Sequence, residues 1–460
     1  MQFIDREQEL ALVRDHLGRS GAGLFVLYGR RRIGKTALLE EALRSVPRAA
    51  YHVGTRSTIA EELSRLSATL ATAWELPLLA AQPLASSRAL LALLEGLDRP
   101  EVLVLDELPF LVESDPAFPG LLQASWDRRL SRSPLKLVCC GSSVGMMEAT
   151  FLEPRAPLFG RRTGQLRLGP LPVAALHGAF GGGPAELIEL AAVFGGVPGY
   201  LQRLDPGDDL AGHLRRRVLR PGEPLFEEIP FLLRNELREP RVYHAILATI
   251  AAGSRKFGEL AAKVGLDRAN LTRYLAVLVQ LGLVEREVPV TEPHPEKSRK
   301  GLYRIADPFV ATWFRFVHPN RDGLERGRVD EVYSSRVAPV FPTWLGLAVE
   351  PVLRELFRGP PLRALVPFDP AWAGRQWSPT GEFDIVLLDE GRRRAFVGEV
   401  KWGAGKVSRA AMDRLRSRAG AEETLRGLDL TFALVARNGF AGRRAARSDE
   451  RLIDVSRLRW

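Results

Sequence analysis

Cysteine and long hydrophobic runs are scarce in this sequence. Its 460 residues include only two cysteines, Cys139 and Cys140. Neighbours in an apolar run point to opposite faces of a strand, which excludes a disulfide-stapled scaffold. No segment approaches the ~20 consecutive apolar residues of a membrane span. The first residues, MQFIDREQEL, are too charged for a signal peptide. We therefore expect a cytoplasmic protein with no membrane partner.

Lysine is also rare, although the chain is basic. Lys and Arg number 65 against 55 Asp and Glu, a net charge of +10, and only 8 of the 65 are lysine. Residues 391–460 hold 17 basic and 8 acidic residues, and residues 241–318 hold 12 and 7. This excess favours a polyanionic partner such as DNA, and a solvated arginine-rich surface is the alternative. Because arginine does not reproduce a compact ammonium, each lysine is a candidate functional residue.

The rest of the composition, 46% hydrophobic and 26% charged, is that of a globular protein, and the length suits about three domains. Apolar runs alternate with helical periods over residues 1–165, which predicts a parallel α/β sheet. A helical segment with glycine and proline punctuation follows over 166–235, and a helical unit closing with a hairpin over 236–320. Residues 331–460 return to a mixed pattern. The predicted fold class is an α/β multidomain protein.

A phosphate-binding loop follows the first apolar run. The segment GRRRIGKT fits the pattern G-x-x-x-x-G-K-[ST] between a strand and a helix. Its backbone N–H groups and the helix N-terminus suit a phosphate, Lys35 suits the β and γ phosphates of ATP or the β phosphate of ADP, and Thr36 suits Mg²⁺. The predicted nucleotide-binding residues here are Gly29, Arg30, Arg31, Arg32, Ile33, Gly34, Lys35, Thr36 and Ala37.

Acidic and hydroxyl residues end the next two apolar runs. VLVLDE ends in Asp106, predicted to hold Mg²⁺, and Glu107, predicted to orient or deprotonate water. An aspartate after a strand is otherwise a common helix cap, but together with the phosphate loop the pair indicates ATP hydrolysis. The following run ends in Ser142, whose hydroxyl either senses the γ phosphate or belongs to a simple turn.

These segments resemble one family. FIDREQEL, YGRRRIGKTALL, VLVLDE, CGSS, PLFGRRT and GGVPGYL are similar in order and wording to the archaeal-type ATPases, which sit near the signal-transducing (STAND) and origin-recognition ATPases of the AAA+ branch. The resemblance covers residues 1 to about 205 and implies a P-loop NTPase core with a helical lid. It implies that Phe3, Ile4, Arg6 and Pro198 lie near the adenine. It also implies that Arg161 or Arg162 is an arginine finger or sensor. Asp5 stands where relatives usually carry Gly.

Residues 241–318 fit a winged helix. VYHAILATIAAG, FGELAAKVG and ANLTRYLAVLVQLGLV read as three helices, and EREVPV to GLYRIAD as a hairpin wing. The third helix would bury Leu271, Leu275, Leu278 and Leu281. Its exposed side and the wing tip are the expected DNA contacts: Asn270, Thr272, Arg273, Lys297, Arg299 and Lys300. A winged helix that serves only as a protein-docking module or a lid is the alternative.

The C-terminal region contains a second acidic group. FDIVLL, DEGRRR and AFVGEVKW read as strand, turn and strand, and a turn centred near 391 places Asp384 opposite Glu399, with Lys401 on the same face. The pattern resembles the PD-(D/E)XK nucleases. That resemblance implies that Asp384, Glu399 and the Val400 carbonyl hold Mg²⁺ or Mn²⁺ and that an upstream Glu350 assists. It also implies that Lys401 positions the attacking water or stabilises developing charge. Pro351 directly after Glu350 suits only a first helical turn or a kink.

The leading hypothesis is an ATP-hydrolysing protein that couples a Mg·ATP switch to DNA binding and metal-dependent DNA cleavage. The alternative is a nucleotide-dependent regulatory switch whose nuclease-like domain is catalytically inactive. A homo-oligomer is compatible with either.

Overall fold

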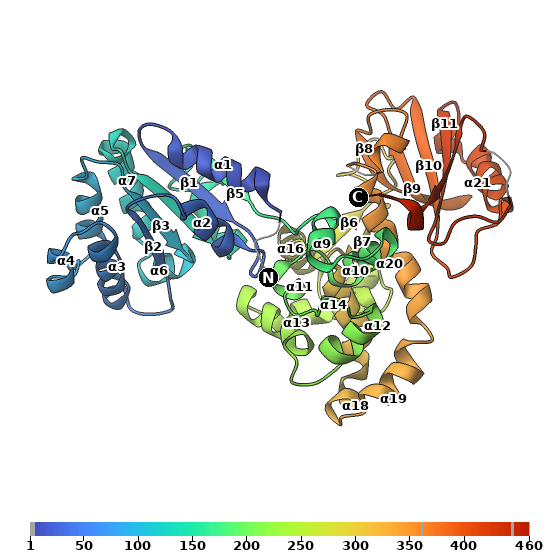
Figure 1. The fold of residues 1–460 in the computed structure, drawn as a ribbon, viewed down its shortest axis with the longest axis horizontal. Coiled ribbons are helices and arrows are strands. Elements are labelled where there is room, and N and C mark those ends of the chain that lie inside the picture. Colours follow the sequence, from blue (N-terminus) through green and yellow to red (C-terminus); the bar gives the residue numbers. More distant parts are fainter. Residues whose placement is uncertain (1–4, 360–361, 443–445, 460) are drawn as a thin grey trace. The chain divides into compact units, whose positions relative to one another are not determined.

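The computed structural model describes residues 5–359, 362–442 and 446–459. The chain divides into two compact units (Figure 1). One comprises residues up to Pro170 together with Val197–Gly199, and the other comprises Leu171–Gly196 and the chain from Tyr200 onward.

The first unit is built on a five-stranded sheet in the order β2-β3-β4-β1-β5, in which every neighbouring pair is parallel. Three strands are buried along their whole length, which is why their sequences are continuous apolar runs. The strands are β1 (Gly23–Tyr28), β2 (Ala49–Val53), β3 (Val102–Asp106), β4 (Lys136–Gly141) and β5 (Gly164–Arg167). β5 spans the boundary predicted at residue 165.

Helices cover this sheet on both faces. The crossover from β1 to β2 runs in one direction along the sheet and the later crossovers run in the other, and right-handed crossovers in opposite directions lie on opposite faces. α1 packs against α2, so these two helices share a face. The helices are α1 (Glu7–Gly18), α2 (Lys35–Leu43), α3 (Ile59–Ala73), α4 (Leu78–Ala81), α5 (Ser87–Glu95), α6 (Leu108–Ser114), α7 (Phe118–Arg128) and α8 (Val144–Phe151).

The second unit begins with a helical segment. α10 is buried almost throughout and packs against α9, α17 and α20. The helices of this segment are α9 (Val173–Phe180), α10 (Pro184–Phe194), α11 (Pro198–Leu201, which straddles the two units), α12 (Leu210–His213) and α13 (Pro224–Glu236). The predicted helical character of this part of the chain is present.

A winged helix follows, as the sequence predicts. α14 (Pro240–Ala251), α15 (Phe257–Val264) and α16 (Arg268–Gln280) precede an antiparallel pair, β6 (Val284–Glu287) and β7 (Leu302–Ile305). Asp267 caps α16 by accepting from the Asn270 N–H at 2.9 Å. The four predicted leucines of α16 are buried: Leu271, Leu275, Leu278 and Leu281.

The unit ends in a mixed sheet of order β12-β11-β10-β9-β8. β8–β9–β10 are antiparallel neighbours and β10–β11–β12 are parallel. The core lies between this sheet and α21, where Val386, Val397, Met412 and Leu415 are buried together. The elements are α17 (Pro308–Thr312), α18 (Arg321–Glu325), α19 (Val329–Val332), α20 (Phe341–Leu356), β8 (Trp372–Ser378), β9 (Gly381–Leu388), β10 (Arg394–Lys401), α21 (Ala410–Ala421), β11 (Asp429–Ala436) and β12 (Glu450–Asp454).

Among the described residues, no helix has both the length and the apolar character that crossing a bilayer requires.

Candidate functional site

The candidate nucleotide site lies at the carboxyl edge of the parallel sheet. The phosphate loop follows β1, Asp106 is the last residue of β3 with Glu107 directly after it, and Ser142 follows β4. Because β4 lies between β1 and β3, Ser142 comes between the phosphate loop and the acidic pair. Carboxyl ends of parallel strands form the usual ligand-binding edge of such sheets.

The phosphate loop is shaped by two glycines. Gly34 has φ of +95° directly before α2, a conformation that side chains rarely adopt. At Gly29 a Cβ would lie 2.5 Å from the Leu168 carbonyl oxygen, so only glycine fits. The Lys35 ammonium donates to the carbonyls of Gly29 at 2.8 Å and Arg30 at 3.0 Å. Lys35 therefore lies over the loop, where the phosphate oxygens of a nucleotide would compete for it.

Asp106 accepts three hydrogen bonds. Thr36 Oγ1 donates to it at 2.9 Å, the Tyr51 hydroxyl at 2.6 Å, and the Glu107 N–H at 2.9 Å. Thr36 and Asp106, the two predicted Mg²⁺ ligands, are thus in contact, and this donor set of one hydroxyl and one buried carboxylate fits Mg²⁺. Sequence reasoning missed Tyr51, which reaches Asp106 from the neighbouring strand β2. Burial and the Asp106 charge raise the pKa of the Tyr51 phenol, so it stays a donor.

Glu107 has a strained backbone. Its φ is +51°, in the left-handed region that non-glycine residues seldom occupy, and such strain concentrates at functional sites. Its carboxylate accepts from Ser142 Oγ at 2.8 Å. A Cβ on Gly54 would lie 2.8 Å from the Glu107 carbonyl oxygen, so the loop after β2 packs closely on this residue.

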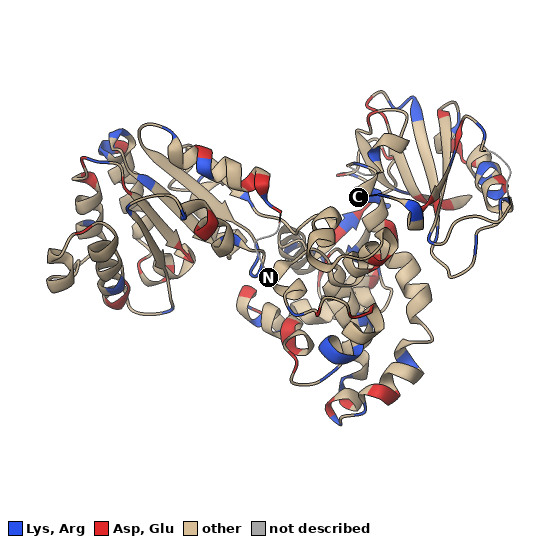
Figure 2. Cartoon of the chain, viewed as in Figure 1, with Lys and Arg blue, Asp and Glu red and all other residues tan. Residues whose placement is uncertain are grey.

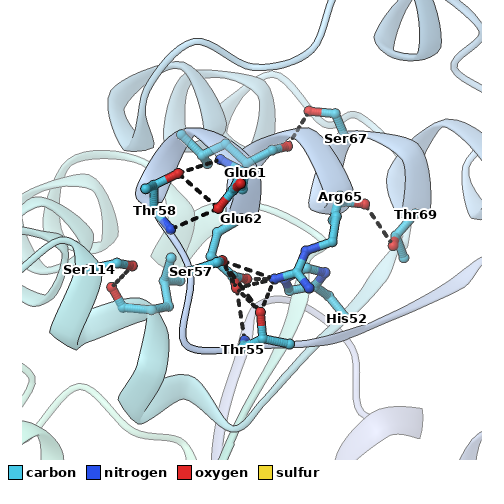
Figure 3. Close-up of polar contacts among 12 residues, drawn as sticks. His52, Thr55, Ser57, Thr58, Glu61, Glu62, Arg65, Ser67, Thr69 and Ser114 are labelled. Carbon is cyan, nitrogen blue, oxygen red and sulfur yellow. Dashed lines mark hydrogen bonds and ion pairs between the residues drawn. The ribbon is translucent and has the colours of Figure 1, made fainter.

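A buried polar cluster holds that loop (Figure 3). The carboxylate of Glu62, on α3, accepts from the Thr55 N–H, the Thr55 hydroxyl and the Ser57 hydroxyl, each at 2.8 Å, and contacts Arg65. His52 Nε2 lies 3.0 Å from its other oxygen. Only 1% of the Glu62 side chain is exposed, so each of these partners is needed to offset burial. The cluster fixes the segment beside Glu107.

Of the residues implied to lie near the adenine, two are placed beside the phosphate loop. Arg6 donates to the carbonyls of Ile33 at 3.3 Å and Gly169 at 2.6 Å. Pro198 Cγ lies 3.7 Å from the position of a Cβ on Gly34. Phe3 and Ile4 fall outside the described residues. The adenine contacts of all four stay a prediction.

The two candidate arginine-finger residues have local partners. Arg161 forms a two-pronged ion pair with Asp127 of α7, at 2.8 Å and 2.7 Å, and Arg162 donates to the Phe151 carbonyl at 3.0 Å. Their role toward a γ phosphate stays a prediction, and one that requires Arg161 to leave Asp127.

The C-terminal hairpin has the predicted register. Gly398 pairs with Ile385, and continuing by one pair sets Glu399 opposite Asp384. The Asp384 carboxylate accepts from the Val400 N–H at 2.8 Å. Glu399 is engaged by Lys401 and by Arg418 of α21.

Glu350 approaches Asp384 from α20. It is buried, and burial together with the Asp384 charge raises its pKa to about 7; burial likewise raises the pKa of Asp384. Pro351 lies in the interior of α20 rather than in its first turn. Its missing N–H leaves the carbonyl of Leu347 to other partners, and the Leu347 side chain is exposed.

The three carboxylates do not form a metal cage as placed. Over residues 5–359, 362–442 and 446–459, no group of three or more His, Cys, Asp or Glu side chains is positioned to hold a metal ion. The physical reason is that Glu399 turns to two cationic side chains. Asp384, Glu399 and the Val400 carbonyl are therefore not grouped around a common point, and their ligand roles stay a prediction.

The expected DNA-contacting residues are exposed. Asn270, Thr272 and Arg273 lie on the open side of α16, and the wing residues Lys297, Arg299 and Lys300 are also exposed. Lys300 is 3.1 Å from Glu292 and Arg273 stacks over Tyr274 at 5.1 Å. Basic residues, all of them arginines, also recur along α21 (Figure 2).

Comparisons with known protein families match three parts of the chain. Residues 3–204 match an ATPase domain predominantly from Archaea, and residues 244–288 match the IclR helix-turn-helix domain. Residues 313–414 match a domain of archaeal and bacterial proteins of unknown function. That match includes the candidate nuclease residues but assigns them no activity.

One relative in sequence and two solved structures match over most of the chain. An uncharacterized protein of Methanocaldococcus jannaschii is 31% identical over 407 residues, which cover 87% of each chain. Among solved structures, Cdc6p from Pyrobaculum aerophilum is 14% identical with a TM-score of 0.33, covering 72% of this chain and 96% of its own. Drosophila ORC bound to DNA is 16% identical with a TM-score of 0.32, covering 68% and 87%. The chain has the parallel-sheet core and the phosphate loop, its residues 3–204 match the archaeal ATPase domain, and the Methanocaldococcus jannaschii protein is 31% identical over most of its length. The chain therefore belongs to the archaeal-type ATPase family.

Proposed function

We propose that this protein is a DNA-associated ATPase in which the nucleotide bound at the phosphate loop controls how the winged helix engages DNA. The observation that carries the proposal is the grouping of Lys35, Thr36, Asp106 and Glu107 at one sheet edge, in a chain that also carries a helix-turn-helix domain. An enzyme that binds and hydrolyses ATP needs each of these groups.

The roles of the side chains follow from their contacts. Lys35 would exchange its two carbonyl acceptors for phosphate oxygens, and Thr36 and Asp106 would hold Mg²⁺. Bound Mg²⁺ supplies charge stabilisation at the phosphates. Glu107 would accept the proton of the attacking water, and Ser142 orients its carboxylate. Tyr51 fixes the side chain of Asp106.

DNA enters the proposal through the winged helix. Exposed Asn270, Thr272 and Arg273 near the start of α16 suit base edges, and the wing lysines suit phosphates. The test is to measure phosphate release and the binding of a labelled duplex in parallel, with ATP, with ADP and without nucleotide. DNA affinity that never changes with nucleotide would contradict the coupling.

Metal-dependent DNA cleavage is a second candidate, favoured by one observation. Buried Glu350 lies close to half-buried Asp384, and burial together with the Asp384 charge raises the pKa of Glu350, a repulsion that a bound cation would relieve. The engagement of Glu399 by Lys401 and Arg418 favours the alternative, a regulator without nuclease chemistry.

Incubation of Asp384→Ala and wild-type protein with DNA and Mg²⁺ or Mn²⁺ separates these two. Cleavage by the wild type that disappears in Asp384→Ala, with ATP hydrolysis retained in both, supports the nuclease. Cleavage equal in both proteins would assign it to a contaminant, and no cleavage in either would leave the regulator.

A further inference from the structure

Glu287, the last residue of β6, is surrounded by four arginines from four different parts of the second unit. Arg255 precedes α15, Arg304 is on β7, Arg354 is on α20 and Arg375 is on β8. The guanidinium nitrogens lie 3.1 Å, 3.0 Å, 3.1 Å and 3.6 Å from the Glu287 carboxylate, in that order. Only 10% of the Glu287 side chain is exposed. One wing carboxylate therefore sits in a nearly closed cage of cations, called here the arginine cradle.

The cradle holds more positive charge than Glu287 balances. Three neighbouring carboxylates balance part of this charge: Glu285 contacts Arg304, Glu382 contacts Arg375, and the Glu350 charge acts on Arg354 and Arg255. Burial and the other arginines nevertheless lower the pKa of Arg354 to about 10, and burial lowers the pKa of Arg255. Like charges gathered and desolvated in this way are costly unless they have an anionic ligand to bind.

The cradle adjoins the C-terminal carboxylates. Arg354 lies one helical turn after Glu350 on α20, and its second terminal nitrogen donates to the Asp384 carbonyl at 3.0 Å. The same guanidinium thus holds Glu287 with one nitrogen and the Asp384 backbone with the other. A ligand in the cradle would lie next to Asp384.

A cavity reaches two of the four arginines of the cradle. Arg255 and Arg304 line an open pocket of about 510 Å³ together with Arg315, Trp344 and Leu347. Arg315 is exposed. A phosphate entering this pocket meets three guanidinium groups, and an aromatic ring beside them offers a surface on which a base can stack.

We propose that the arginine cradle is a binding site for a nucleic-acid phosphodiester and that the Glu287 carboxylate occupies it as an internal stand-in. A phosphodiester has the same charge as a carboxylate and offers comparable paired acceptors to guanidinium groups. DNA that reaches Asp384 would have to displace Glu287, so the wing restrains the C-terminal site. This inference rests on the proposed association with DNA.

The test compares Glu287→Gln with a matched control, Glu285→Gln, in the full chain. Glu285 is two residues away on the same strand and contacts Arg304 without contacting Arg354 or Arg375 in the pairs described. Removing the stand-in charge should raise the affinity for a short labelled duplex about tenfold and steepen its dependence on salt, since freed arginines release counterions. The control should change affinity less than twofold. Adding Arg354→Met to Glu287→Gln should remove the gain.

The outcome separates this inference from the proposed function. If wild type binds the duplex, Arg273→Ala weakens that binding, and folded Glu287→Gln binds no tighter, then Glu287 is only part of a buried ion-pair network and the inference is overturned alone. If neither wild type nor Glu287→Gln binds DNA, the proposed association and this inference both fail.

A measurement on wild type covers the case in which Glu287→Gln does not fold. Hydrogen exchange of the β6 and β7 amides should accelerate when DNA is added, because the phosphodiester displaces Glu287 and loosens the wing. Unchanged or slower exchange there, with DNA bound, would overturn the inference.

Discussion

The ammonium group of Lys35 places a positive charge at the phosphate loop of the nucleotide site. It is buried and its only described acceptors are two loop carbonyls. In a chain with 8 lysines among 65 basic residues, a lysine is retained where a compact ammonium is needed. Its loss should act on nucleotide binding rather than on folding.

Lys35→Ala should weaken ATP binding by roughly tenfold to a hundredfold and abolish hydrolysis, because the phosphates lose a point charge in a sheltered site. Calorimetric titration with Mg·ATP checks this, and circular dichroism confirms the fold. Lys406→Ala, an exposed lysine of the C-terminal domain, is the matched control and should bind as wild type does. Unchanged affinity in Lys35→Ala would contradict the site.

Glu107 combines a strained backbone with a carboxylate held by Ser142. Glu107→Gln keeps the shape and removes the base, so ATP should still bind while turnover falls by about 10²-fold or more. The control is Glu113→Gln, an exposed glutamate of α6. Steady-state phosphate release and nucleotide affinity are measured together. Loss of affinity without a specific loss of turnover would show that Glu107 is structural.

At the scale of elements, strand order decides which contacts a sequence reveals. The phosphate loop and the hairpin register are local, because they depend on spacing within a few residues, and the sequence predicts both. The Tyr51–Asp106 bond joins residues 55 positions apart. It depends on β2 lying beside β3, which no local pattern encodes.

Contacts that bring together side chains from several helices, strands and loops could not be predicted from the sequence. The arginine cradle takes its arginines from one loop, two strands and one helix, and each looks like an ordinary surface arginine in the sequence. The turn of Glu399 toward Arg418 likewise follows from where α21 packs. The hairpin register predicts that Asp384, Glu399 and Lys401 share one face of the sheet. It does not determine whether they group into a metal site.

The packing of α1 on the sheet gives a test at this scale. The His16 ring lies 4.8 Å from the ring of Phe25 on β1, and only 4% of the residue is exposed. Burial, then the charges of Lys136 and Arg19, lower the pKa of His16 from 6.5 to about 4. The folded imidazole therefore stays neutral over a pH range in which the unfolded one is protonated.

The free energy of unfolding should consequently fall as pH decreases from about 6.5 to about 4, since the unfolded state binds the additional proton. The full loss is up to about 3 kcal/mol. His16→Gln, which is neutral throughout, should remove this part of the pH dependence, and His177→Gln, an exposed histidine, should not. Urea unfolding at pH 7 and at pH 5 measures this change in the free energy of unfolding. Parallel pH dependence in wild type and His16→Gln would contradict the packing of α1.

At the scale of the whole molecule, the chain combines an ATPase domain with a helix-turn-helix domain and a C-terminal sheet domain. Within the second unit, Glu189 of α10 accepts from the Trp402 indole at 2.8 Å and pairs with Arg437. Trp402 directly follows Lys401. Within the second unit, the helical segment that follows the ATPase domain in the sequence is therefore joined to the end of the strand that carries the C-terminal lysine.

The most direct test of this account is the DNA affinity of Glu107→Gln protein, which should bind ATP without turning it over. Binding of a labelled duplex is measured by anisotropy at one salt concentration, with Mg·ATP, with Mg·ADP and without nucleotide. The account predicts that the ATP-bound and ADP-bound proteins differ in affinity at least fivefold, a coupling free energy of about 1 kcal/mol. The difference should disappear in Lys35→Ala. Equal DNA affinity in all three nucleotide states, with ATP binding confirmed, would contradict it.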